Sequence, residues 1–263
     1  MPENNLFGIK KRVTAVNQTR KITRTMELIA SSRLQRGKVL LAGHQEWAMY
    51  IREAARCLPD SYFKPFPNPA GDGQKAYIVF GGDKGFSGSY SPNLLQYAEP
   101  IVNGHLILAV GTAAESFFPG SHSILSLTPP SISCAAAIVE EANTVYENNE
   151  IDEVYMIYTK SSKHITERLF PLLPLERRFD KVIIEPSAET VFPTLLRAYA
   201  ESVVYEVHLH TFIAEQVARV AAMDNATKNA DEIHDILQAT YNRIRQSNIT
   251  QEITGVANSA EGG

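Results

Sequence analysis

The chain has little cysteine and no long uninterrupted apolar run. Its two cysteines, Cys57 and Cys134, fit neither a disulfide framework nor a zinc site, so we expect free, at least partly buried thiols in a reducing cytosol. The longest uncharged stretch, residues 116–139, contains three prolines and many hydroxyl residues, which excludes a membrane span there. The first residues, MPENNLFGIKKR, have no apolar core of signal-peptide length.

Proline is absent from both ends of the chain after Pro2. Thirteen of the 14 prolines lie between Pro59 and Pro193, which leaves residues 3–58 and 194–263 free to form long helices. Charge divides along the same lines: the net charge is +7 for residues 1–58, −7 for 59–193 and −4 for 194–263. We therefore expect three segments, with residues 1–58 and 187–263 as helical arms and residues 75–186 as a middle domain.

Apolar residues at both ends recur every three or four positions, which is typical of one face of an α-helix. The N-terminal face is Ile9, Val13, Val16, Thr19, Ile22, Met26 and Ile29, and the C-terminal face includes Tyr199, Val203, Val207, Ile213, Val217, Val220, Met223, Thr227, Ala230, Ile233, Leu237 and Tyr241. We expect one helix from about residue 7 to 58 and a second that starts after an N-cap at Ser187 and ends near Gly255.

Helices of this length do not fit inside a compact globule of 263 residues. About 50 residues span roughly 75 Å, whereas such a globule has a radius of gyration near 18 Å. The exposed apolar faces need a partner, and the basic N-terminal arm suits the acidic C-terminal arm. The sequence thus predicts a long antiparallel coiled coil of the two ends.

The middle segment alternates short apolar runs with amphipathic ones, which indicates a Rossmann-like α/β domain with a mainly parallel sheet. The expected strands are residues 75–80, 106–110 and 153–159, with possible edge strands at 169–175 and 179–185. The expected helices are residues 93–102, 112–118 and 133–148, and residues 64–73 read as a linker.

The sequence contains no strong motif for catalysis, nucleotide binding or metal binding. The glycine-rich turn at 81–88 follows a strand, but it matches neither dinucleotide-binding nor Walker patterns, so we interpret it as structural and expect no cofactor. His208 and His210 lack the i, i+4 spacing of a helical metal pair and are expected to be polar surface positions of the coiled coil. We expect no catalytic residues, no metal and no nucleic-acid binding.

Three stretches resemble the γ subunit of F-type ATP synthases, which forms the central stalk of F1. Residues 9–35 (IKKRVTAVNQTRKITRTMELIASSRLQ) resemble its N-terminal helix. Residues 215–254, with AMDNATKNA and YNRIRQSNITQE, resemble its C-terminal helix, and Gly82-Asp-Lys-Gly-Phe-Ser-Gly88 resembles the turn that opens its middle domain. The resemblance implies a rotor shaft that turns with the membrane c-ring inside the α3β3 ring and couples ion transport to ATP synthesis without doing chemistry itself.

The resemblance also implies partner contacts. Residues at family positions that meet the β subunit are Met26, Arg33, Arg245, Gln246, Thr250 and Glu252. Glu201 and Tyr205 match more weakly a stretch near the ε subunit and the c-ring. The implied location is peripheral, at the cytoplasmic face of a bacterial cell membrane. A divergent γ-like paralogue, a free-standing coiled-coil α/β nucleotide-binding enzyme and a coiled-coil scaffold remain as alternatives.

Overall fold

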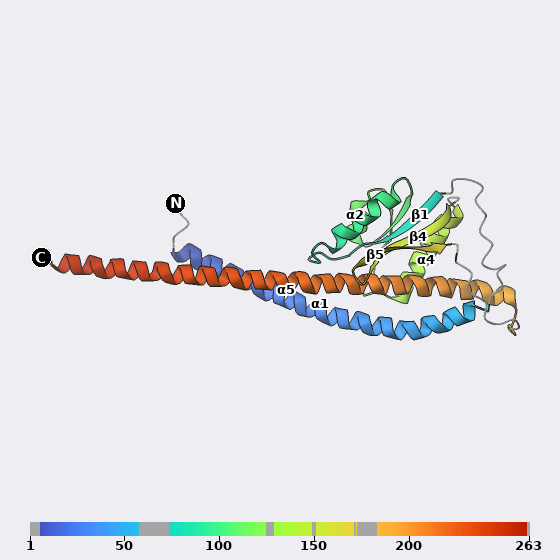
Figure 1. Ribbon diagram of the computed structural model, residues 1–263, viewed down its shortest axis with the longest axis horizontal. Helices are drawn as coiled ribbons and strands as arrows, with labels where there is room; N and C mark the ends of the chain where they lie inside the picture. Colours follow the sequence, from blue (N-terminus) through green and yellow to red (C-terminus); the bar gives the residue numbers. More distant parts are fainter. Residues whose placement is uncertain are drawn as a thin grey trace. The chain divides into compact units, whose positions relative to one another are not determined.

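Two long helices begin and end the described chain. The computed structural model describes residues 6–57, 74–124, 129–148, 151–170, 172 and 183–261, and α1 (Leu6–Ala55) and α5 (Ala188–Glu261) contain 50 and 74 residues (Figure 1). Ser187 occupies the expected N-cap position, because its carbonyl oxygen accepts the first helical bond from the Val191 N–H at 3.2 Å.

The expected end of the last helix at Gly255 is wrong, since α5 continues to Glu261. A single glycine costs only about 1 kcal/mol in a helix. No proline follows Gly255 in the sequence to force an end.

The chain forms two compact units, and both long helices contribute to each. One unit contains Met1–Ala30 and Arg219–Gly263, and the other contains Ser31–Ala218. We call the first the paired-helix unit and the second the α/β unit. None of the helices in the described residues is both long and apolar enough to cross a membrane.

The α/β unit contains a mixed five-stranded sheet in the order β3-β2-β1-β4-β5. Pairing is parallel except between β4 and β5, which form an antiparallel hairpin. The strands are β1 (Gln74–Phe80), β2 (Leu106–Val110), β3 (His122–Ile124), β4 (Ile151–Lys160) and β5 (Lys163–Phe170), and the short helices are α2 (Tyr90–Val102), α3 (Thr112–Phe117) and α4 (Ile132–Asn148).

The three central strands and the three short helices match the sequence expectations, but the expected edge strands do not. The edge strand beside β4 is β5, which contains only residues 169 and 170 of the strand expected at 169–175; residue 172 is not in a strand, and residues 171 and 173–175 lie outside the described residues. The hairpin turn is Ser161-Ser162, with φ of 47° and 68°. Serine gives no strong signal for such a turn, which favours Asn and Gly.

The expected strand at 179–185 and the expected linker at 64–73 lie largely outside the described residues. Residues 179–182 and the linker at 64–73 lie outside the described residues, whereas residues 183–185 do not form a strand. Strand β3 was missed because it has only three residues.

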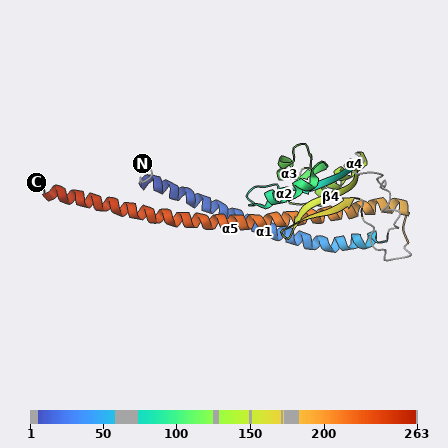
Figure 2. The same ribbon diagram turned by 45° about the horizontal axis from the view of Figure 1, so that its top comes forward.

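The middle of α5 lies in the core of the α/β unit. One sheet face packs on α4 and on α5 residues such as Val204, Val207 and Leu209, and the other face packs on α2 (Figure 2). Helix α1 covers α5 closely, because a Cβ added at Gly37 would lie 3.1 Å from Phe212 Cδ1. This part of α5 is therefore buried on nearly all sides, and its free energy of folding comes mainly from apolar burial.

Candidate partner-binding surface

The residues buried between α1 and α5 in the paired-helix unit are mostly small, apart from Ile9 and Met223. Thr23 and Ala30 of α1 and Met223, Thr227 and Ala230 of α5 are all buried there. Helices with small residues in their contact can approach more closely than helices that interlock leucines. The helix pair is therefore narrow and has little apolar core of its own.

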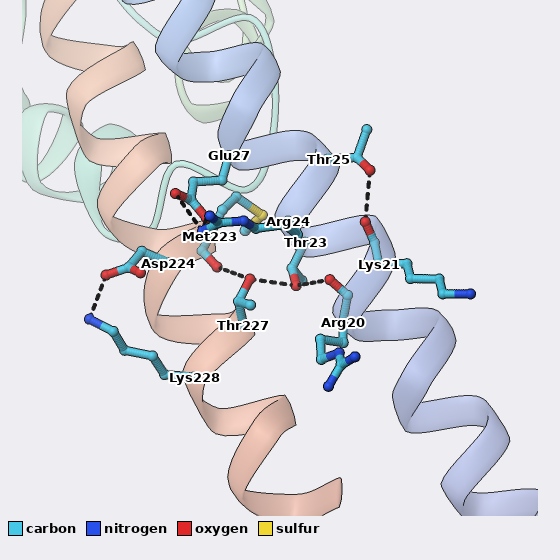
Figure 3. A network of polar contacts seen from close by, with 10 residues as sticks. All are labelled: Arg20, Lys21, Thr23, Arg24, Thr25, Glu27, Met223, Asp224, Thr227 and Lys228. Carbon is cyan, nitrogen blue, oxygen red and sulfur yellow. Dashed lines mark hydrogen bonds and ion pairs between the residues drawn. The ribbon is translucent and has the colours of Figure 1, made fainter.

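Two threonine hydroxyls link the helices (Figure 3). Thr227 Oγ1 lies 2.8 Å from Thr23 Oγ1 and 2.8 Å from the Met223 carbonyl oxygen, and Thr23 Oγ1 lies 3.1 Å from the Arg20 carbonyl oxygen. Each hydroxyl carries one hydrogen, so two of these three contacts are hydrogen bonds at any moment. This network fixes the register of the two helices.

Charge contributes less to the pairing than the sequence suggested. Arg20 Nη1 bonds Asp231 Oδ1 across the helices at 3.0 Å, and both side chains are about half exposed. Arg24 instead pairs with Glu27, and Lys228 with Asp224, each within its own helix. Exposed pairs of this kind are worth about 0.2–1 kcal/mol.

The apolar face expected on α1 is wrong in part. Ile22 and Ile29 are 57 % and 48 % exposed, whereas Thr23 and Ala30, one position further along, are buried. One residue turns a helix by 100°, so the contact runs along a neighbouring face. Leu28 is also exposed, and on α5 the same holds for Ile233, Ile236, Ile249 and Ile253.

The sequence-predicted contact residues are spread over the two units. Met26 is half-buried in the paired-helix unit, and Arg33 is half-buried in the α/β unit. Arg245, Gln246, Thr250 and Glu252 are exposed on α5, and Thr250 Oγ1 donates to the Gln246 carbonyl oxygen at 2.9 Å.

The end of α5 extends past the start of α1 in the paired-helix unit (Figure 1). Thr23 faces Thr227 and Arg20 faces Asp231, so an antiparallel partner for residue 245 would be about residue 5 or 6. All residues from 245 to 255 are exposed. All sides of α5 are therefore accessible in this stretch.

Glu201 and Tyr205 lie in the α/β unit. Glu201 accepts from Arg197 Nε at 2.9 Å, and Arg197 also pairs with Glu140 of α4 at 3.0 Å. Tyr205 is only 7 % exposed and meets His44 edge-on, with 4.8 Å between ring centroids. Burial raises the pKa of Tyr205. Of the two side chains, Glu201 offers the larger surface.

The same part of α5 lines a charged cavity. Its volume is about 360 Å³, and Tyr199 and Glu206 of α5 face Arg52, Lys160 and Arg168 across it. Glu206 has a lowered pKa, chiefly because His210 donates to it. This cavity could not be predicted from the sequence, since its residues come from four separate elements.

The expectation for His208 is wrong. Its side chain is 3 % exposed in the core, with its ring 6.1 Å from that of Phe80, and burial lowers its pKa to about 4. His210 is half-buried, 3.5 Å from Glu206. The i, i+3 pattern includes His210 but cannot reveal that the opposite face of α5 packs on the sheet. Within the described residues, no three His, Cys, Asp or Glu side chains form a potential metal site.

The glycine-rich turn is built into the sheet. The Gly81 N–H donates to the Val110 carbonyl oxygen at 2.8 Å, and the Ala113 N–H donates to the Gly82 carbonyl oxygen at 3.1 Å. A Cβ at Gly81 would lie 2.7 Å from the Ala114 backbone nitrogen. These contacts agree with the structural interpretation of the turn.

The comparisons with known proteins decide the family. The ATP synthase family model matches residues 5–262, and the ATP synthase gamma chain of Ruminiclostridium cellulolyticum is 32 % identical over 98 % of both chains. The chain belongs to the ATP synthase gamma family. The gamma chain of Clostridium acetobutylicum is 31 % identical over 97 % of both chains. As a gamma chain, the protein is a non-catalytic subunit of ATP synthase.

Solved structures share the fold. The rotor of the Euglena gracilis mitochondrial ATP synthase is similar with a TM-score of 0.68 at 16 % identity, over 93 % of this chain and 98 % of that one. The central stalk of the Tetrahymena thermophila enzyme is similar with a TM-score of 0.58 at 22 % identity, over 78 % and 99 %. The expected fold, paired terminal helices plus an α/β middle domain, is confirmed.

Proposed function

We propose that the paired-helix unit is the rotor surface that meets the β subunits of an α3β3 ring in turn and sets the state of each catalytic site. The observation that supports this is the set of exposed isoleucines on a narrow helix pair. Apolar side chains of this number on a two-helix unit favour a surrounding protein partner. In this proposal residues 1–58 and 187–263 form the shaft and residues 75–186 form the middle domain.

The proposed β contacts are Met26, Arg33, Arg245, Gln246, Thr250 and Glu252. The four residues on the exposed end of α5 support the proposal, because within the described residues no other element of the paired-helix unit covers them. Their differing chemistry on one helix gives each β subunit a different face as the shaft turns. Differential contacts of this kind shift the population of each β conformation.

The proposed base of the rotor lies in the α/β unit. Glu201 and Tyr205 would lie near the ε subunit and the c-ring. Tyr205 is buried, so it would contribute by holding α5 against His44 of α1. The complex would sit at the cytoplasmic face of a bacterial membrane, in line with the bacterial relatives.

The experiment replaces Met26 with Lys in a reconstituted complex. The family resemblance implies that Met26 faces an acidic segment of each β subunit, called the lever. The new cation would pair with a carboxylate of one lever at one rotary position, and such a pair is worth about 1.5–3 kcal/mol. A position held this strongly slows rotation. We expect ATP hydrolysis and assembly to survive while ions pumped per ATP fall, more so at low salt.

Met49→Lys is the matched control. Met49 is an exposed methionine on the same helix, 16 positions beyond Arg33, the last proposed β contact on α1. It should pump as wild type does. Equal pumping by Met26→Lys and wild type at low and high salt would show that Met26 does not face β.

A second measurement separates this function from the nucleotide-binding alternative. The isolated full-length chain should show no stoichiometric ATP binding by calorimetry, because its glycine-rich turn lacks a phosphate-loop lysine. Binding at a one-to-one ratio would show that the gamma chain carries a nucleotide site, which this proposal does not include.

A further inference from the structure

The strand order of the α/β unit creates a topological switch point at the carboxyl ends of its parallel strands, which we call the crevice. Strand β1 lies between β2 and β4, so the chain leaves β1 toward one side of the sheet and returns on the other. In open α/β sheets this switch point is where ligands bind, commonly with an anionic group at the start of a helix. Here the crevice is bordered by the turn at Gly82, the start of α2 at Tyr90 and Ser91, and Thr159 at the end of β4.

A side chain of α5 fills this crevice. Glu215 belongs to the same compact unit and is only 3 % exposed. A Cβ added at Gly82 would lie 3.5 Å from Glu215 Cδ and 2.7 Å from Ser91 Oγ. The carboxyl group therefore lies against the backbone of the glycine-rich turn and beside the first turn of α2.

Tyr90 is close enough to Glu215 to sense its charge. Tyr90 donates its hydroxyl to the Thr211 carbonyl oxygen at 3.3 Å, one helical turn from Glu215. Burial raises the pKa of Tyr90, and the charge of Glu215 raises it further. At the start of α2 the Tyr90 N–H donates to the Ser87 carbonyl oxygen at 3.3 Å and Pro92 has no N–H, so the Ser91 N–H is the group through which this helix end would stabilise an anion.

We propose that the crevice is an anion site whose ligand is part of the chain: the carboxylate of Glu215 occupies the place that a phosphate takes in nucleotide-binding relatives of this fold. The bound carboxylate fastens the α/β domain to α5. It also gives Gly82 a specific role, since a Cβ at this position would displace the Ser91 hydroxyl, which lies beside the carboxylate. This inference is independent of which partners the paired-helix unit meets.

The test is chemical rescue in the full-length chain. Glu215→Ala removes a CH₂ group and a carboxylate, and acetate has almost the same atoms. We expect the variant to unfold at a lower temperature, with amide exchange across residues 82–91 about tenfold faster than in wild type. Acetate should restore both values along a saturable curve, whereas acetamide, which is neutral and of the same shape, should not.

Glu232→Ala is the control, because Glu232 is exposed on the same helix. Neither it nor wild type should respond to acetate in this way. An equal response to acetate and acetamide, or the absence of a saturable acetate effect on a folded Glu215→Ala chain, would overturn the proposal.

Glu215→Gln covers the case in which Glu215→Ala does not fold. It keeps the shape and removes the charge, so exchange across residues 82–91 should rise while exchange in α4 stays unchanged. Wild-type stability and exchange in Glu215→Gln would show that the crevice needs the shape of the side chain and not its charge.

Discussion

Helix α5 passes through two different environments. In the α/β unit its residues are surrounded by the sheet and α1, and large apolar side chains such as Leu209 are fully buried. In the paired-helix unit it shares one narrow face of Thr and Ala with α1 and exposes its isoleucines. The same regular helix thus gains its stability from burial in one unit, whereas its apolar surface in the other is left for a partner.

The largest expected difference is between two apolar truncations on α5. Leu209→Ala should cost about 2–5 kcal/mol, because it leaves a cavity in the core of the α/β unit. Ile236→Ala should change stability by less than about 0.5 kcal/mol, since Ile236 is 66 % exposed. Chemical denaturation of both full-length variants checks this, and similar losses would mean that the two regions do not differ.

The pH dependence of stability should come largely from the α/β unit. The pKa of His208 is lowered to about 4 in the folded chain, from 6.5 when unfolded. Above pH 6.5 both states are neutral at this residue. As pH falls toward 4, only the unfolded state takes the proton, so the folded state loses about 2 kcal/mol by pH 5.

Replacing His208 with Leu should remove this loss. Denaturation at pH 7 and pH 5 measures it, with His122→Gln as the control at a half-exposed histidine. An unchanged pH dependence in His208→Leu would show that other groups cause the acid sensitivity.

The threonine pair should contribute about 1 kcal/mol in the paired-helix unit. Thr23→Val and Thr227→Val keep the side-chain shape and remove the hydroxyls that lie 2.8 Å apart. A double-mutant cycle, followed by hydrogen exchange of residues 9–30, should give a coupling free energy of this size. Strict additivity of the two substitutions would argue against the hydroxyl contact.

The smallest effect should come from the ion pair between the helices. Arg20→Gln should cost about 0.2–1 kcal/mol at low salt and less at high salt, because both partners are exposed. The same exchange measurement on residues 9–30 detects it. A loss well above 1 kcal/mol that salt leaves unchanged would assign the pairing to charge.

Much of the fold could be predicted because its signals are local. Proline absence and a period of three to four residues were enough for α1 and α5, and continuous apolar runs were enough for β1, β2 and β4. Strand β5 could not be found this way, because KHITERLF is polar and becomes a strand only by pairing with β4.

The partner-binding surface was harder to predict, because periodicity does not distinguish an internal contact from an external one. Ile22 and Ile29 satisfy the helical pattern as well as Thr23 and Ala30 do, yet the smaller residues face α5. Leu28 was a sign available in the sequence, because it is a large apolar residue that lies outside the expected apolar face of α1. His208 was misplaced for a related reason, since two partners cover opposite faces of α5 in the α/β unit.

The shared hydrogens of Thr23 and Thr227 make the helix contact mechanically soft. Rotation of a hydroxyl about its Cβ–Oγ bond moves a hydrogen bond from one acceptor to another without moving a heavy atom, on a time scale of picoseconds to nanoseconds. Leucines interlocked as knobs in holes would resist a shift of a few tenths of an ångström. The threonine contact instead allows the two helices to shift by this amount while their register stays the same.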